Sequence, residues 1–393
     1  MIGNQPRLGE NIEVYDLNAI GRRLYEMQFG PARIVPRDTI RSLLIEAAKE
    51  ITGHKVREHF LMTEWEEVVD AWQLQNWEAY RDVQRLGRKT RLAEQQRQTL
   101  WSIFDRVRSG LKTQGLMTHA ELLGRVASEV ASRQHAPFDF AVIDEAQDVS
   151  IAQLRFLAAL GAGRPNSLFF AGDLGQRIFR QPFSWKALGV DVRGRSRTLH
   201  INYRTSHQIR AQADRLLAPE VSDVDGNIEE RKGTISAFNG PPPAIDVFDS
   251  PNSEIAAVAA WLSERGKEGV APHEIGVFVR SAAELSRARS AVQAAGLPFK
   301  VLDEGVDTTT GYVSVSTMHL AKGLEFRAVA VMACDDEVIP LQERIETVAD
   351  DRDLEEVYNT ERHLLYVACT RARDHLLVTG VEPASEFLDD LRM

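Results

Sequence analysis

The spacing of hydrophobic and polar residues differs between two parts of the chain, and this difference indicates two kinds of structure. Residues 38–134 include a long stretch poor in Gly and Pro, which predicts helices. Within this region one set of apolar residues recurs at i, i+3, i+4 and i+7, which places them on one helix face. They are Trp65, Val68, Val69 and Trp72. We interpret them as core residues; the alternative is an aromatic platform for stacking.

From residue 138 onward, short apolar runs alternate with helical stretches. The run Phe138–Asp144 (FDFAVID) is bounded by Pro137 and by a cluster of carboxylates, which predicts a buried strand. Further strands are predicted at 167–171, 198–201, 245–248, 275–279, 313–316, 328–332 and 376–379. Helices are predicted between them, notably at 154–160, 207–217, 254–265, 283–295 and 362–373. Such alternation predicts α/β layers built on parallel sheets.

Composition places the chain among ordinary globular proteins. Its 393 residues are 44% hydrophobic and 26% charged, enough for two or three domains. No run of about 18 apolar residues occurs, so we expect no membrane span. The first residues also lack the pattern of a secretory signal. The only two cysteines, Cys334 and Cys369, lie far apart, which argues against a disulfide framework or a zinc site and favours a reducing cytoplasm.

Charge is distributed unevenly, and this changes what the total implies. The net charge of -10 by itself argues against nucleic-acid binding. However, basic residues dominate from Arg81 to Lys112, whereas acidic residues dominate from Asp335 to Glu356. Both runs can be interpreted as solvated surface. For the basic run, contact with DNA is a second hypothesis.

The first candidate chemistry follows the predicted strand at 138–144. The sequence Asp144-Glu145-Ala146-Gln147-Asp148 puts carboxylates just beyond the end of a parallel strand, where α/β folds bind ligands. One carboxylate there can hold Mg²⁺ and its neighbour can take a proton from an attacking water. The alternative is a helix N-cap at Asp144 with acidic residues in the first turn.

Further motifs follow in a fixed order along the chain. They are Gly172-Asp173-Leu174-Gly175-Gln176-Arg177-Ile178, Leu199-His200-Ile201-Asn202-Tyr203-Arg204-Thr205, the stretch 315–326 (VSTMHLAKGLEF) and the stretch 361–373 (ERHLLYVACTRAR). Together with the carboxylate motif they resemble motifs II to VI of the UvrD/Rep family of superfamily 1 DNA helicases.

This resemblance implies an α/β fold of two RecA-like parallel-sheet motor domains, the first incomplete, with a helical insertion of the 1B type. The implied boundaries are a remnant of the first domain (1A) at 1–30, the insertion at 31–130, the rest of 1A at 131–200 and the second domain (2A) at 201–393. About a dozen residues separate Val301 from Val313, where relatives often insert a 2B subdomain, so we expect that subdomain to be absent.

The resemblance also implies roles in ATP hydrolysis. Asp144 would bind Mg²⁺, Glu145 would deprotonate the lytic water, and Gln176 would sense the γ-phosphate. Tyr203 would stack on adenine, and Glu325, beside Gly323, would hold the ribose. Arg204 and Arg371 would neutralise charge on the γ-phosphate, for which the planar fork of arginine is suited. A surface salt bridge is the alternative for Arg204.

DNA contacts are implied at two further places. Phe179, Phe183 and Trp185 follow the motif III match, where the family places base-stacking side chains; core packing is the alternative. Thr317 and His319 in the motif V match are candidate contacts to phosphate. The implied partner is single-stranded DNA.

One expected element is missing from the sequence. Superfamily 1 motors use a Walker A loop, G-x-x-x-x-G-K-[ST], to cradle phosphates. Gly87-Arg88-Lys89-Thr90 has an intervening Arg, and Gly110-Leu111-Lys112-Thr113 follows no strand. We therefore expect that the chain starts inside the first motor domain, and that an upstream segment or a partner chain supplies the loop.

Two hypotheses remain at this point. The first is an ATP-dependent helicase or translocase that moves 3′→5′ on single-stranded DNA, inactive as an isolated chain without its loop. The second is a non-catalytic relative that binds DNA or a partner protein. A nuclease is not favoured, because no other paired-acid pattern surrounds a predicted strand.

Overall fold

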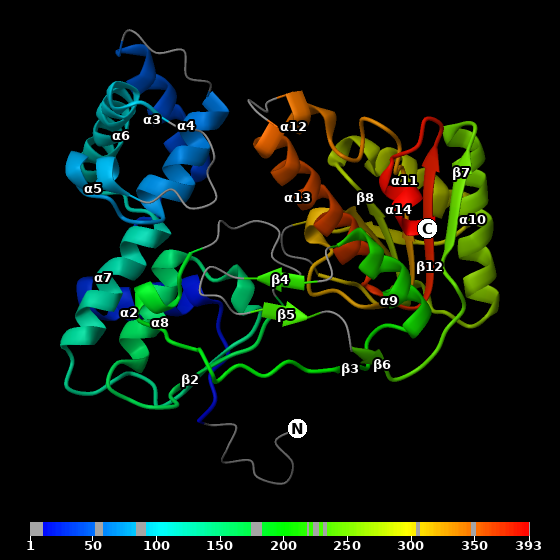
Figure 1. The fold of residues 1–393 in the computed structure, drawn as a ribbon, viewed down its shortest axis with the longest axis horizontal. Coiled ribbons are helices and arrows are strands. Elements are labelled where there is room, and N and C mark those ends of the chain that lie inside the picture. The colour runs from blue at the N-terminus through cyan, green and yellow to red at the C-terminus, as the bar shows by residue number, and fades with distance from the viewer. Residues whose placement is uncertain are drawn as a thin grey trace. The chain divides into compact units, whose positions relative to one another are not determined.

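The computed structural model describes residues 11–51, 58–83, 92–173, 183–217, 220–222, 228–230, 234–303, 307–346 and 351–392. The chain forms two compact units. The first unit comprises residues 1–173, 180–195 and 223–225, and the second comprises residues 174–179, 196–222 and 226–393. Each unit is described by itself below, with the element labels of Figure 1.

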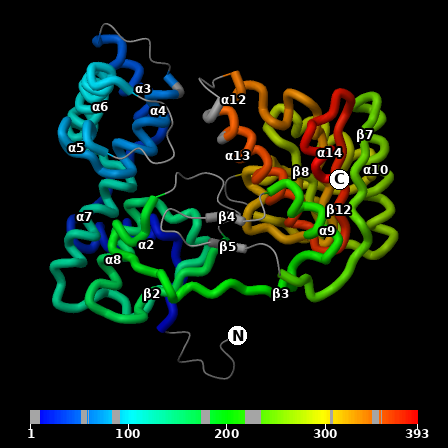
Figure 2. Tube along the Cα trace, in the orientation of Figure 1, coloured from blue at the N-terminus to red at the C-terminus, as the bar shows by residue number. Residues whose placement is uncertain are grey.

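The first unit begins with a helical body. Its elements are α2 (Leu17–Phe29), α3 (Arg37–Lys49), α4 (Glu58–Glu64), the π-helix η1 (Trp65–Asp70), α5 (Trp77–Asp82), α6 (Glu94–Gln114) and α7 (His119–Ser132). Figure 2 traces α3 and α6 side by side in blue and cyan, and the two helices are in contact. Gly115 ends α6 in the left-handed conformation at φ +64°, which suits glycine. Thr118 then caps α7 by accepting a hydrogen bond from the Glu121 backbone N–H.

The core of this helical body contains the residues that the helical spacing singled out. Trp65, Val68 and Val69 are buried in one cluster with Phe104, and Trp72 packs against it partly buried. The prediction that they are core residues is confirmed. Their local geometry was not foreseen, because Trp65–Asp70 forms a π-helix rather than a regular α-helix. Such single turns are frequent at functional sites.

A short α/β layer completes the first unit. Strand β1 (Ala141–Ile143) pairs in parallel with β2 (Leu168–Phe170), and α8 (Ile151–Gly161) connects them. A capping box begins α8, where Ser150 and Gln153 exchange hydrogen bonds between side chain and backbone. The predicted strands at 138–144 and 167–171 are present but shorter than predicted. The expected burial of the first strand is wrong, because Val142 in β1 is 75% exposed.

The second unit is built on a six-stranded sheet with the order β7-β12-β11-β8-β10-β9. Every neighbouring pair in it is parallel. Its strands are β7 (Ala244–Phe248), β8 (Ile275–Val279), β9 (Phe299–Val301), β10 (Val313–Thr317), β11 (Phe326–Val331) and β12 (Ala372–Val381). The helices include α9 (His207–Ala213), α10 (Pro251–Lys267), α11 (Leu285–Ala294), α12 (Gln342–Glu346), α13 (Asp351–Cys369) and α14 (Phe387–Arg392). Short pairs β3 (Ile201–Asn202) with β6 (Ile235–Ser236), and β4 (Glu220–Ser222) with β5 (Ile228–Glu230), lie outside this sheet.

Both faces of the six-stranded sheet are covered, as parallel sheets require. In β11, Val329 and Val331 belong to the cluster formed with α9, α13 and α14. Ala328 and Ala330 belong to the opposite cluster, with α10 and α11. The predicted α/β fold with parallel sheets is confirmed. Because all six strands are parallel, as in a RecA-like sheet, their amino ends lie at one edge of the sheet and their carboxyl ends lie at the opposite edge.

One element was predicted wrongly at its end. The predicted helix at 362–373 runs two elements together, because α13 ends at Cys369 and β12 begins at Ala372. The first residues of β12 include Arg373, Asp374 and His375, whose polar side chains look like the end of a helix rather than a strand. Because these residues are polar, the apolar pattern predicted a strand only at 376–379, whereas β12 begins at Ala372.

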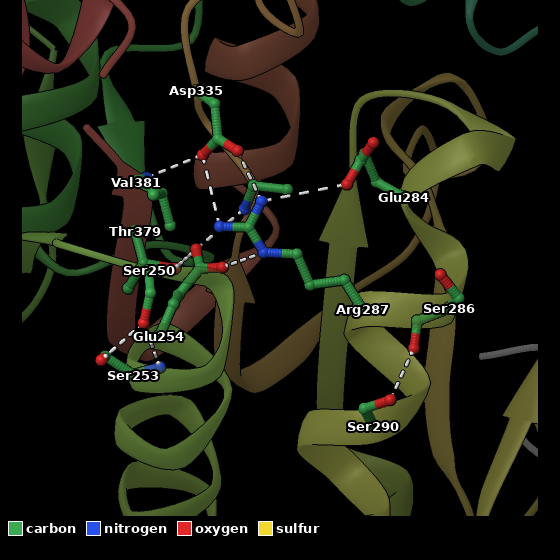
Figure 3. A network of polar contacts seen from close by, with 11 residues as sticks. Ser250, Ser253, Glu254, Glu284, Ser286, Arg287, Ser290, Asp335, Thr379 and Val381 are labelled. Carbon is green, nitrogen blue, oxygen red and sulfur yellow. Dashed lines mark hydrogen bonds and ion pairs between the residues drawn. The ribbon is translucent and has the colours of Figure 1, made fainter. Parts of the chain in front are cut away.

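A charged network ties the carboxyl edge of this sheet to two helices (Figure 3). The Arg287 guanidinium forms ion pairs with Glu254 and, at 2.5 Å, with Asp335. Glu254 also accepts hydrogen bonds from the Thr379 hydroxyl at 2.6 Å and the Ala333 N–H at 3.0 Å. Asp335 was part of the acidic run interpreted as surface; the structure instead joins it to this network.

The described helices contain none that is long and apolar enough to cross a bilayer. Cys334 and Cys369 are both buried free thiols, and burial raises the pKa of each.

A pH effect on stability is expected from Asp70 in the helical body. Burial raises its pKa from 3.8 to about 6, Glu121 and Glu66 add to the rise, and hydrogen bonds from Thr118 and Gln73 oppose it. Between about pH 4 and pH 6 the folded chain therefore holds a proton that the unfolded chain has lost. Stability falls as the pH rises through this window, by about 3 kcal/mol at most.

Urea unfolding of the wild type and Asp70→Asn at pH 4 and pH 7 measures this effect. Asparagine cannot ionise, so the variant is expected to gain stability relative to the wild type on going to pH 7. Asp105→Asn, an exposed position on α6, serves as the matched control. An identical pH dependence in wild type and Asp70→Asn would show that the carboxyl group titrates normally.

Candidate nucleotide and DNA sites

The carboxylates of the motif II match stand at the carboxyl ends of β1 and β2. Asp144 is exposed, and its Oδ1 accepts a hydrogen bond from the Glu145 N–H at 2.9 Å. Glu145 adopts the left-handed conformation at φ 50°, which is uncommon for a residue with a side chain. Asp144 is not an N-cap of the following turn; that position belongs to Glu145, which makes no side-chain cap.

Gln147 fixes this arrangement, and the sequence reasoning gave it no role. Its side-chain N–H donates to Glu145 Oε2 at 2.5 Å, and its oxygen accepts from the Asp173 N–H at 3.0 Å. A Cβ at Gly172 would lie 2.4 Å from that oxygen, so a larger residue there would displace the Gln147 side chain. Gln147 thus links the ends of both strands. Because its side chain is uncharged, the sequence pattern does not mark it as a site residue.

The carboxyl end of β1 fits Mg²⁺ only if other ligands complete the coordination. No group of three or more metal-ligating side chains occurs among the described residues. Mg²⁺ usually takes one or two carboxylates, with waters and substrate phosphates for the rest. Asp144, exposed at the strand end, suits that role.

One face of the two-stranded sheet is bare within the described part of the chain. Val142 and Phe169 are register partners on this face and are 75% and 61% exposed; Phe140 beside them is 74% exposed. The opposite face, with Ile143, is packed into the core of the unit. Parallel strands are normally buried on both sides, so this face has the character of an incomplete layer.

The nucleotide residues expected in the second unit gather near the amino edge of its sheet. Arg204 and Glu325 form an ion pair, and both side chains remain about half exposed. The Asn202 side chain positions Arg204 by accepting its backbone N–H at 2.8 Å. Tyr203 is exposed, as a ring that stacks on a base needs to be, and Gly323 has φ +77°. Arg204 therefore does form a surface salt bridge, which was the alternative, but its partner Glu325 is itself an expected nucleotide-site residue.

Arg371 lies at the same edge but differs from Arg204 in being buried. Its side chain is 1% exposed and donates to the carbonyls of Val367 at 3.0 Å and Leu324 at 3.5 Å. A role on phosphate therefore requires the guanidinium to leave carbonyl partners. The sequence match did not show this burial.

The DNA residues expected in the motif V match lie at the opposite, carboxyl edge. Thr317 ends β10, and His319 follows in the 3-10 turn η8 (Met318–Leu320). Burial lowers the pKa of His319 to about 4, and the cations Arg280 and Arg344 add to this while Glu361 opposes it. The imidazole is therefore neutral at pH 7 and would contact phosphate as a hydrogen-bond donor without a charge.

A buried ion cluster supports this turn. Glu361, fully buried, pairs with the guanidinium of Arg280 through two hydrogen bonds and with Arg344 at 2.9 Å. Residues 318–325 then lead from the carboxyl end of β10 to the amino end of β11. Met318 and Ala321 in this short link are completely buried. The sequence reasoning missed Arg280 and Glu361 as a pair, since nothing marks residues so distant in sequence as partners.

The remaining predicted DNA residues belong to the first unit or lie outside the described residues. Phe183 is buried in the core of the first unit, and Trp185 packs partly buried against that core. The Trp185 ring meets Phe170 edge to face at 4.9 Å between ring centres. Core packing thus accounts for Phe183. Gln176 and Phe179 lie outside the described residues.

The basic run at 81–112 is largely paired where the structure describes it. Arg81 forms an ion pair with Asp82, Arg106 with Glu50, and Arg108 donates to the Gln75 carbonyl at 2.7 Å. Contact of this run with DNA stays a prediction.

Comparison with known proteins agrees with the order of the motifs. Residues 8–183 match the UvrD/REP helicase N-terminal domain family, and residues 303–382 match the UvrD-like helicase C-terminal domain family. A "Probable DNA helicase" of Mycoplasma pneumoniae is 25% identical over 255 residues, which cover 63% of this chain and 44% of that protein. The ATP-dependent DNA helicase PcrA of Staphylococcus epidermidis is 42% identical over 79 residues, 20% of this chain and 10% of PcrA.

A shorter match links the chain to the putative ATP-dependent DNA helicase YjcD of Bacillus subtilis, 45% identical over 69 residues, 17% of this chain and 9% of YjcD. The matches thus span less than half the length of these relatives. Among solved structures, the C-terminal domain of a possible DNA helicase from Lactobacillus plantarum WCFS1 aligns over 48% of this chain and 93% of that domain. Its TM-score is 0.34 at 23% identity. The two family matches follow one another in chain order, and the chain belongs to the UvrD-like helicases of superfamily 1.

Proposed function

We propose that this chain is the greater part of an ATP-driven motor that moves along single-stranded DNA in the 3′→5′ direction. The observation that carries the proposal is the pairing of Arg204 with Glu325. These residues come from separate motifs, and the fold brings them together with exposed side chains at one edge of the sheet. Phosphoryl transfer is catalysed mainly by positioning and by positive charge near the equatorial oxygens, which an exposed arginine can supply.

The residues of the first unit suit the other half of the reaction. Glu145, whose side chain accepts a hydrogen bond from Gln147, would orient a water and accept its proton. Asp144 would hold Mg²⁺, which supplies charge neutralisation on the phosphates when bound. In the second unit Glu325 offers carboxylate oxygens to ribose hydroxyls, and Tyr203 offers a ring face to a base.

DNA would be held at the other edge of the second sheet. Thr317 and His319 lie at the β10 end of the segment 317–325 and Glu325 lies at its β11 end, so nucleotide and strand would act on opposite ends of one short segment. Hydroxyl and neutral imidazole donors suit phosphate oxygens, with no need to read a sequence. Such contacts fit a motor that travels along any strand.

The phosphate-cradling loop would come from a polypeptide segment outside the described residues. Two independent observations support this proposal. The sequence holds no G-x-x-x-x-G-K-[ST]. The sheet beside Asp144 and Glu145 also exposes Val142 and Phe169, as an incomplete layer would. A segment with a strand, a loop and a helix would supply both missing parts. The strand would extend the sheet, and the loop at the helix N-terminus would bind the phosphates through its backbone N–H groups.

A non-catalytic relative is the second candidate, and one observation favours it. Arg371 is buried against backbone carbonyls, a position compatible with a structural role alone. In that case the chain would bind DNA or a protein without consuming ATP.

ATP hydrolysis by the 393-residue chain, with and without single-stranded DNA, tests the proposal. The chain alone is expected to show little turnover. Adding or fusing a strand-loop-helix segment with a Walker A loop is expected to restore DNA-stimulated turnover. Turnover by the chain alone would disprove the external loop but support the motor, whereas no turnover in either preparation would favour the non-catalytic relative.

A further inference from the structure

The helical body of the first unit contains a pocket that none of the helicase motifs uses. It has a volume of about 360 Å³ and lies among η1, the end of α6 and the start of α7. Trp65, Asp70, Gln73, Arg108, Lys112 and Thr118 are among the residues that line it. Pockets for small molecules typically measure about 300–1,000 Å³, so this volume suits a small organic ligand.

The polar wall of the pocket is held rigid, with one acceptor left over. Asp70 Oδ1 accepts hydrogen bonds from the Thr118 hydroxyl at 2.6 Å and from Gln73 Nε2 at 2.9 Å. Gln73 is itself fixed in the left-handed conformation at φ 55°. Both bonds end on Oδ1, so within the described part of the chain Oδ2 has no hydrogen-bond donor. The carboxylate therefore presents Oδ2 as a fixed acceptor that is open to a ligand or to water.

The pocket is also lined by a residue with an unsatisfied donor. Trp65 is 2% exposed, and its Nε1–H has no acceptor among the described residues. Buried donors of this kind are rare in folded proteins and call for an explanation. A ligand that offers a hydrogen-bond donor would satisfy Asp70, and one that also offers an acceptor would suit Trp65 on the same pocket lining.

Cations complete the lining on the solvent side. Lys112 is exposed and makes no ion pair with the described residues. Arg108 is anchored by the Gln75 carbonyl at 2.7 Å, and Arg125 pairs with Glu121 at 2.6 Å. Because Arg108 and Arg125 pair with Asp105 and Glu121, Lys112 is the positive group best suited to neutralise an anionic tail.

From these features we propose that the pocket binds a nucleotide, with its base edge toward Asp70 and Trp65 and its phosphate near Lys112. A nucleobase is flat, has a donor next to an acceptor on its edge, and suits the apolar walls formed by Val69 and Leu111. The nucleotide would be either a free mononucleotide or one residue of a bound strand. This site is separate from the residues proposed for ATP hydrolysis and does not depend on them.

Isothermal titration calorimetry of the full chain with the deoxynucleoside monophosphates tests the proposal. Asp70→Asn keeps the acceptor for Thr118 but turns the free acceptor into a donor, so binding is expected to weaken about 10- to 100-fold. Lys112→Gln, at an exposed position where folding is not at risk, is expected to weaken binding up to about fivefold. Arg106→Gln, on the same helix but outside the pocket lining, is the matched control and should bind as the wild type does.

Two further comparisons separate this proposal from the motor. Glu145→Gln is expected to leave monophosphate binding unchanged. If Glu145→Gln removes binding and Asp70→Asn keeps it, the nucleotide occupies the motor site and the proposal is wrong. Absence of any monophosphate binding at millimolar concentration would overturn it equally.

A short single-stranded oligonucleotide distinguishes the two sources of the nucleotide. If Asp70→Asn weakens binding of both the oligonucleotide and the monophosphates, the pocket holds a residue of the strand. If it weakens monophosphate binding alone, the pocket holds a free nucleotide. Either result supports the pocket, whereas unchanged affinity for both ligands contradicts it.

Discussion

Replacing Glu361 with alanine is expected to destabilise the second unit by about 3–5 kcal/mol, because it leaves a buried arginine without its counter-charge. The Arg280 side chain is 3% exposed and donates two hydrogen bonds to Glu361. Arg344, which also pairs with Glu361, is more exposed and can turn to water. Urea unfolding followed by circular dichroism measures the loss.

Glu343→Ala is the matched control, since it removes the same charge from an exposed position on α12. It is expected to change stability by less than about 0.5 kcal/mol. A double substitution, Arg280→Met with Glu361→Leu, should recover most of the loss, because apolar pairs often replace buried ion pairs well. An unchanged unfolding midpoint for Glu361→Ala would mean that the pair contributes nothing to the fold.

The second large effect concerns catalysis. Arg204→Ala, in the preparation that carries the Walker A loop, is expected to lower ATP hydrolysis by about 10³-fold or more, as loss of an arginine at the γ-phosphate does. Its ion pair with Glu325 is exposed, so the substitution should cost less than about 1 kcal/mol of stability. Arg204→Lys is expected to recover only part of the rate, because lysine lacks the planar fork.

Steady-state hydrolysis at saturating DNA gives the comparison. Arg289→Ala, another exposed arginine of the second unit on α11, is expected to keep the wild-type rate. A full rate in Arg204→Ala would remove the proposed role of this residue and favour the interpretation of the pair as a surface salt bridge.

Much of the second unit follows from the sequence because its elements are locally consistent. Ile275–Val279 is an apolar run with polar neighbours, and the strand has these same bounds. The order of the motifs also predicts that Arg204 and Glu325 belong to one nucleotide site, and the two side chains form an ion pair.

Other features depend on contacts between distant residues, which no local pattern reveals. Arg371 matches its motif, but its burial results from packing against Val367 and Leu324. Phe183 follows the motif III match, where DNA contact was expected, yet it lies in the core of the first unit. Asp70 is an ordinary carboxylate in sequence and becomes distinctive only when Thr118 and Gln73 close around it. The bare sheet face was also invisible, since exposed and buried valines look alike in a sequence.

The link of residues 318–325 has a mechanical consequence. Its buried Met318 and Ala321 anchor the first half of the link to the core beneath the sheet, whereas Gly323 and Glu325 in its second half are exposed. A flexible connection would let one end move while the other stayed still, so a displacement would not be transmitted along it. Held at Met318 and Ala321, the link would pass a displacement of Glu325 on toward Thr317.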